Sequence, residues 1–183
     1  MQRVMSRVGP AELTLDAIAR EAGVTAGALV HRFGSKRQLQ IRLAQASADW
    51  GPAFVTELRA QHRSPLAALR AYADCMAGLA ETPAAYLRNL AYLHEDLSDP
   101  ELRAPLERQG RTTRREIERL IVAAVSAREL TPSTNAKGLA RVIETTISGS
   151  MLTWAFYREG AADKWIRADL EAVLAPYLPR RRG

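Results

Sequence analysis

The chain has 183 residues, of which 47% are hydrophobic and only 6% aromatic, and its formal net charge is +6. This composition allows a hydrophobic core, and the abundance of alanine and leucine favours helices over sheets. The single cysteine excludes an intramolecular disulfide and a cysteine-based metal site. No run of about eighteen apolar residues and no signal-peptide pattern occurs, so we expect a soluble cytoplasmic protein without a membrane partner.

Positive charge gathers near the N-terminus. Seven basic and three acidic side chains lie within the first 45 residues, while the middle of the chain is close to neutral. Positive charge gathered at one end is typical of a DNA-binding protein. A protein whose surface charge serves only solubility can, however, have a similar net charge. We interpret the arginines at 180–182 as a tail without a function of its own.

The first specific pattern predicts a helix over residues 15–22. Thr14 is placed to cap its first turn, and Asp16 lies where negative charge suits the helix dipole. Gly23 follows, and glycine ends a helix in the left-handed conformation at low steric cost. The sequence therefore predicts a short helix that stops at a tight turn.

A second short helix follows the turn. Thr25 is placed to cap it, and Leu29 and Phe33, four residues apart, form its inner face. Ser35 and Gln38 then form a capping box that starts a third helix at about residue 36. Two short helices joined by a glycine turn form a helix-turn-helix, whose exposed second helix fits the major groove of DNA.

This stretch resembles the TetR family of one-component bacterial regulators. The resemblance implies a DNA-binding regulator, most simply a repressor, that acts as a homodimer on a palindromic operator and responds to a small molecule. The matching positions are Thr14, Ile18, Ala19, Ala22, Gly23, Val24, Gly27, Leu29, His31, Phe33, Ser35, Lys36 and Leu39.

Four positions depart from the family pattern. The family usually has an aromatic residue at Val30, often another at Arg32, commonly a proline at Gly34, and frequently a lysine at Ala26. The family's first helix is also longer than the stretch before Gly9, since only about eight residues precede it here. A helical ligand-binding or scaffold protein with a degenerate DNA-binding head is therefore the alternative function.

The second helix supplies most of the candidate DNA contacts. His31 and Arg32 are the side chains expected to reach bases or phosphates, and Lys36 is the expected phosphate clamp. Lys36 and Arg37 are poor partners for the dipole at a helix start, so either a phosphate or a plain solvated face explains them. The full set of expected contacts is Thr14, Thr25, Ala26, Ala28, Val30, His31, Arg32 and Lys36.

Proline steps divide the rest of the chain. Ser64, Thr82, Asp99 and Thr131 each precede a proline, a pattern typical of a capped helix start. The expected helices span 36–62, 65–81, 83–97, 100–129 and 132–158, with a final helix capped by Asp163 and ending near Tyr177. A kink is expected at Gly51-Pro52, and a late start or a bend at Pro105.

The predicted fold class is all-α. A three-helix DNA-binding head over residues 1–45 precedes a helical bundle over 46–183 that serves effector binding and dimerisation. No nucleophile with a base, metal-ligand spacing or phosphate loop occurs, so we expect no enzyme, no metal and no cofactor.

The last two helices carry the expected dimer interface. The first of them is apolar on two sides, which favours burial on both, although ordinary intrachain core explains one side as well. In the resembled family these helices pair with their copies in a second subunit. The candidates are Ile143, Ile147, Ser150, Trp154, Tyr157, Leu170, Val173, Leu174 and Tyr177.

A small-molecule site is expected between the head and these helices. The resembled family binds its effectors in this region, but the same apolar stripes are also typical of packed core. A ligand there would change the spacing of the two heads through its different affinity for two states. The candidates are Tyr72, Cys75, Met76, Leu79, Tyr86, Leu90, Leu93, His94 and Ile121.

Overall fold

The computed structural model describes residues 2–5, 7–48 and 50–179, and the arginines at 180–182 lie outside this range. Helices form almost all of the regular structure of the described residues, and no strand occurs among them, as predicted. The elements are α1 (Gln2–Met5), η1 (Pro10–Glu12), α2 (Leu15–Ala22), α3 (Ala26–Phe33), α4 (Lys36–Ser47), α5 (Trp50–Gln61), α6 (Pro65–Ala77), α7 (Pro83–Ser98), α8 (Pro100–Ser126), α9 (Ala136–Tyr157), α10 (Ala162–Leu174) and η2 (Ala175–Tyr177).

Three of the four predicted proline caps are confirmed. The Ser64 hydroxyl accepts from the amide of residue 67 at 3.0 Å, and the Thr82 hydroxyl from that of residue 85 at 3.1 Å. The Asp99 carboxylate accepts from the amide of residue 101 at 3.0 Å. Each proline that follows occupies the first helical turn, where its missing N–H costs nothing.

The predicted caps at Thr131 and at Asp163 were wrong. Thr131 begins a turn in which both the amide and the hydroxyl of Thr134 donate to its carbonyl, at 3.1 and 2.7 Å. Helix α9 therefore starts later, with Asn135 as its cap. In α10 the N-cap is Ala161, and Asp163 lies in the first turn without a capping hydrogen bond.

Of the two remaining proline predictions, the interruption expected near Gly51-Pro52 is present, whereas the late helix start expected at Pro105 is not. The expected helix over 36–62 is two helices, because Pro52 cannot donate to the carbonyl of Ala48 and its ring crowds that turn. In contrast, α8 starts at Pro100 and continues through Pro105, which is buried. Pro52 thus follows an interruption between two helices, whereas Pro105 is accommodated inside one helix and is buried there.

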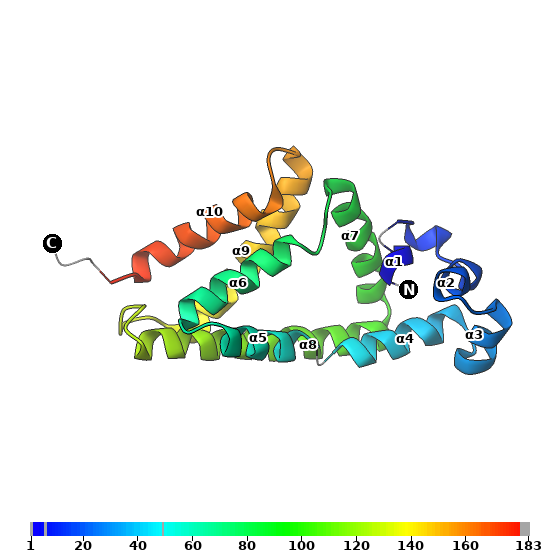
Figure 1. Cartoon of the computed structure of the whole chain (residues 1–183), viewed down its shortest axis with the longest axis horizontal. Coiled ribbons are helices and arrows are strands. Elements are labelled where there is room, and N and C mark those ends of the chain that lie inside the picture. Colours follow the sequence, from blue (N-terminus) through cyan, green and yellow to red (C-terminus); the bar gives the residue numbers. More distant parts are fainter. Residues whose placement is uncertain (1, 6, 49, 180–183) are drawn as a thin grey trace.

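The chain has two hydrophobic cores. The larger one joins α5, α6, α8, α9 and α10 and includes the fully buried Leu69, Ile121, Ile143 and Ile166. The smaller one lies in the head among α1 to α4 and contains Val4, Leu13, Ile18, Ala19, Leu29 and Leu39, together with Tyr92 of α7. Figure 1 shows α1, α2 and α3 at one end of the molecule, with α7 between them and the bundle of α6, α9 and α10.

None of the helices in the described part of the chain is both long and apolar enough to span a membrane.

Candidate nucleic-acid interface

The helix-turn-helix has the predicted local structure. The Thr14 hydroxyl accepts from the Ala17 amide at 3.1 Å and caps α2. Gly23 adopts φ 68°, a left-handed conformation that a side chain would strain. The Thr25 hydroxyl accepts from the Ala28 amide at 3.1 Å and caps α3. Two capped helices are therefore held at a sharp angle by one glycine.

Helix α3 has a buried and an exposed side. Leu29 is buried and Phe33 partly buried in the small core, as predicted from their spacing. The outer side is exposed and consists of Gly27, Ala28, Val30, His31 and Arg32. Because the residues at 27 and 28 are small, the backbone of α3 can approach a partner closely. The longer side chains at 30, 31 and 32 then extend around that close contact.

Arg32 lies at the edge of this exposed side. Its guanidinium carbon is 5.4 Å from the centroid of the Phe33 ring, a cation–π distance. The guanidinium therefore lies over the Phe33 ring, although the side chain as a whole stays exposed. His31, in contrast, is exposed on the outer side itself.

The turn after α3 requires a glycine. Gly34 has φ 82°, which proline cannot adopt because its ring fixes φ near −65°. Its amide donates to the carbonyl of Val30 at 2.7 Å. The Ser35 hydroxyl then accepts from the Gln38 amide at 3.1 Å and starts α4, as predicted. The departure from the family's common proline therefore has a conformational cause.

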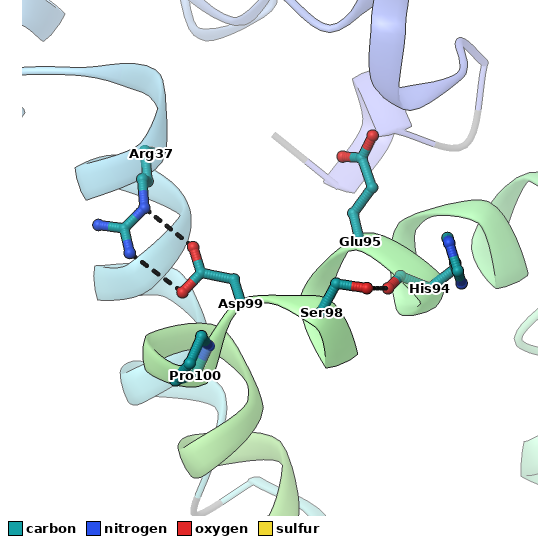
Figure 2. Close-up of a pocket in the computed structure, with 6 residues that line it drawn as sticks. All are labelled: Arg37, His94, Glu95, Ser98, Asp99 and Pro100. Carbon is teal, nitrogen blue, oxygen red and sulfur yellow. Dashed lines mark hydrogen bonds and ion pairs between the residues drawn. The ribbon is translucent and has the colours of Figure 1, made fainter.

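Of the two basic residues in the first turn of α4, Arg37 has a partner within the chain. Its Nε and Nη2 donate to the two carboxylate oxygens of Asp99 at 2.9 and 3.0 Å, as Figure 2 shows, and it also pairs with Glu101. This hydrogen bonding holds the pKa of Asp99 below its usual value. The positive charge of Arg37 at the start of α4 is thus explained by its carboxylate partners, without a phosphate. Lys36 is only partly exposed and has no ion pair with the described residues.

Tyr92 is a second link between head and body, and sequence reasoning missed it. Its ring is 3% exposed inside the small core, and its hydroxyl donates to the Val8 carbonyl at 2.9 Å. Burial is the first cause that raises its pKa. Nothing in the local sequence distinguishes Tyr92 from the other apolar residues of α7, because its contacts lie 84 positions away.

The predicted effector residues differ in burial. Tyr72, Met76 and Tyr86 pack against the large core, and Ile121 is fully buried in it. Burial, helped by the charge of Glu144, raises the pKa of Tyr72 to about 12. Leu90 is partly exposed, and the exposed members are Cys75, Leu79, Leu93 and His94.

His94 instead lines an open surface hollow of about 650 Å³ near the head. Figure 2 shows Arg37, Asp99 and Pro100 on one side of this hollow and His94, Glu95 and Ser98 on the other. The Ser98 hydroxyl donates to the backbone carbonyl of residue 94 at 2.9 Å. The hollow is therefore part of the junction between α4 and the α7–α8 corner, away from the predicted effector region.

Most of the predicted dimer residues belong to the chain's own core. The Ser150 hydroxyl donates to Asp169 of α10 at 2.6 Å, and the Trp154 ring donates to the carbonyl of Gly160, in the loop between α9 and α10, at 3.1 Å. Only Tyr157 is exposed, and Val173 and Tyr177 are partly covered. The residues buried within the chain are Ile143, Ile147, Ser150, Trp154, Leu170 and Leu174.

The other side of α9 is uncovered. Val142 is 44% exposed, Leu152 50% and Phe156 76%, and these residues share one side of the helix with Thr145 and Gly149. Alanines at 161, 168, 172 and 175 are exposed along the neighbouring helix α10. The spacing in the sequence predicted two apolar sides of α9 but could not say which one its own chain covers.

The chain is similar to known proteins in its N-terminal segment and in its fold. Residues 2–43 match the family described as bacterial regulatory proteins, tetR family. Three solved structures share the fold over almost the whole chain.

Escherichia coli NemR in its reduced form is 15% identical, with a TM-score of 0.77, and the alignment covers 99% of this chain and 95% of NemR. A TetR transcription regulator from Haloarcula marismortui ATCC 43049 is 16% identical with a TM-score of 0.75, covering 97% and 93%. SmeT, the repressor of the Stenotrophomonas maltophilia multidrug efflux pump SmeDEF, is 19% identical with a TM-score of 0.70, covering 98% and 87%. No curated protein matches the chain.

Proposed function

We propose that this chain, a TetR-family transcriptional regulator by its N-terminal domain and its fold, is a ligand-responsive repressor that binds a palindromic operator as a homodimer. It would act in the cytoplasm and carry out no catalysis. The observation that carries the proposal is the exposed side of α3. Small residues and two side chains that can hydrogen-bond are presented there on a helix that the small core holds rigidly.

The proposed contacts divide into two kinds. His31 and Arg32 extend from α3 and can donate to base edges or to phosphates. Thr14 and Thr25 begin α2 and α3, so the free amides of both helix ends are available to phosphate oxygens. Lys36 adds a positive charge at the start of α4. The remaining expected contacts, Ala26, Ala28 and Val30, can offer only close packing to the groove.

The uncovered side of α9 supports the homodimer. An exposed row that includes Val142, Leu152 and Phe156 is unfavourable in water, and a second copy of the same row is a matching partner. Gly149 and the alanines of α10 allow helices from two subunits to approach closely. Two heads held about 34–36 Å apart would then read two half-sites one DNA turn apart.

The response to a ligand would pass through α7. One part of α7 packs on the large core through Tyr86, and another part places Tyr92 in the small core of the head. Asp99, at the corner that follows, holds Arg37 of α4. A small molecule that binds between α6, α7 and α8 and moves α7 would therefore change the position of α3. SmeT, which shares this fold, is a repressor of an efflux pump, and we extend only the repressor role to this chain.

The direct test is a fluorescence anisotropy titration of the full chain on duplex DNA that flanks its own gene. We expect sequence-specific binding that survives an excess of random duplex, with two chains per operator and a strong dependence on salt. Binding to no duplex, or equally to every duplex, would favour the scaffold alternative. Release of the DNA by an added small molecule would identify the effector class.

A further inference from the structure

A cavity of about 460 Å³ lies where the head meets the body. Met5 of α1 and Leu43 of α4 line it from the head side, and Leu102 and Leu106 of α8 line it from the body side. Leu43 is 39% exposed although it faces this apolar surface, while Leu102 is buried. Gln40 and Ser47 of α4 also line it, so the cavity combines leucines from both sides of the junction with polar side chains of α4. None of the predicted effector residues is among its described lining.

One carboxylate lies in this lining. Asp96 of α7 lines the cavity, and none of the other described residues that line it is basic. Asp96 has no hydrogen bond or ion pair with the described residues, unlike Asp99, which holds Arg37. Burial, followed by the charges of Glu95 and Asp99, raises the pKa of Asp96. An unpaired carboxylate beside apolar walls is unfavourable unless a cation approaches it.

We propose that this cavity binds a small organic amine, with its protonated nitrogen on the Asp96 carboxylate and a compact apolar group against Leu43, Leu102 and Leu106. A charged N–H donor bonded to a carboxylate is one of the stronger interactions available at such a site. The apolar group would replace water on Leu43 and Leu106, which the chain leaves partly or largely exposed.

Binding of the amine would stiffen the junction. The cavity is lined by α1 and α4 of the head and by α7 and α8 of the body, so an occupant contacts both parts at once. It would hold α4 at one angle to α8, and with it the recognition helix α3. This regulatory consequence rests on the proposed function, whereas the binding itself does not.

The binding is tested on the full chain without DNA, so its failure is distinguishable from a failure of DNA binding. Isothermal titration calorimetry compares 1-adamantylamine with 1-adamantanol, two rigid molecules that differ in one polar group. We expect the amine to bind at least ~10-fold more tightly than the alcohol. Asp96→Asn should remove this preference, because the side chain keeps its shape and loses its charge.

Glu95→Gln is the matched control, since Glu95 lies next to Asp96 on α7 but does not line the cavity. It should keep at least a third of the amine's affinity. Leu106→Trp should weaken both compounds by filling the cavity, and it locates the site even if the Asp96 variant fails to fold. Equal affinity for amine and alcohol, a preference that persists in Asp96→Asn, or unchanged binding in Leu106→Trp would each overturn the proposal.

Discussion

Helices α3 and α9 each leave one side without a partner among the described residues, and the two sides differ in chemistry. The uncovered side of α3 carries the polar His31 and Arg32 beside the small Gly27 and Ala28 and the apolar Val30. The uncovered side of α9 is apolar, with Leu152 and Phe156 at half and three-quarters exposure. A polar, basic side can stay in water until an anionic partner arrives, whereas an apolar side is best covered permanently.

Because their exposed sides differ in chemistry, we expect α3 and α9 to bind different kinds of partner. We expect α3 to bind DNA transiently and in a salt-dependent way, and α9 to bind a second copy of the chain throughout. The two contacts depend on each other, because only a dimer presents two α3 helices to one operator. The experiments below separate them, beginning with the largest expected effect.

Loss of the dimer should have the largest effect. The double change Leu152→Glu and Phe156→Glu places two charges on the uncovered side of α9 and should convert a dimer into a single chain of 20.2 kDa. Operator affinity should then fall by about 10²- to 10⁴-fold, because the second head no longer binds at high effective concentration. Sedimentation and anisotropy measure the two quantities.

Leu79→Glu provides the control for the dimer test. Leu79 is 59% exposed and lies beyond the end of α6, so it is not part of the exposed row on α9. Its replacement should change neither mass nor affinity. A double variant that stays dimeric would assign the subunit contact to another surface.

The second-largest effect is expected from the contact that Tyr92 of α7 makes with the head. Tyr92→Ala should lower the free energy of unfolding by about 3–5 kcal/mol, because it empties part of the small core. Tyr92→Phe should cost only about 1 kcal/mol, the hydrogen bond to Val8. Urea unfolding of both variants measures this. If both substitutions cost the same, the buried ring does not join the head to α7 as described.

Substitution of Arg32 tests whether α3 recognises the DNA sequence. Its replacement by alanine should cost about 1–3 kcal/mol of operator binding if the guanidinium pairs with a guanine. Affinity for random duplex should change much less. An equal loss on specific and random DNA would mean that Arg32 contacts only the backbone.

Lys36 tests the phosphate contact. Lys36→Ala should weaken binding to all duplexes about equally and reduce the slope of log affinity against log salt by about one. The same slope in variant and parent would remove Lys36 from the DNA interface. Comparing the Lys36 and Arg32 variants distinguishes sequence-specific contacts with bases from non-specific contacts with phosphates.

The smallest expected effect concerns the exposed ion pair between Arg37 and Asp99. Because the pair lowers the pKa of Asp99, its contribution to stability is present above the usual aspartate pKa of about 3.9 and is lost as pH falls through the lower folded-state value. Arg37→Met should therefore be less stable than the parent at neutral pH and equally stable in strong acid. Unfolding curves over a pH series check this, and a difference that grows toward acid would contradict it.

The head could be predicted from the sequence because its determinants are local. Thr14, Thr25 and Ser35 each cap a helix by bonding to an amide three residues later, and Gly23 sits at the turn it allows. Hydrogen bonds over such short spacings depend on adjacent residues alone. The helices after Ser64, Thr82 and Asp99 were predicted correctly for the same reason.

What could not be predicted depends on contacts between distant parts of the chain. Periodicity identified two apolar sides on α9, but only the packing of α8 and α10 decides that Ile143 is buried and Val142 is not. Tyr92 and Arg37 also find partners far away in the sequence. The role of the predicted effector residues stays a prediction.

The central claim is that two α3 helices, held by a dimer, read a duplex. Selection of the full chain's preferred sites from a random duplex library tests it most directly. We predict an enriched palindrome whose half-sites are one helical turn apart, and a weaker enrichment when His31 and Arg32 are replaced by alanine. A library that returns no common sequence, or the same palindrome with undiminished enrichment from the double variant, would contradict it.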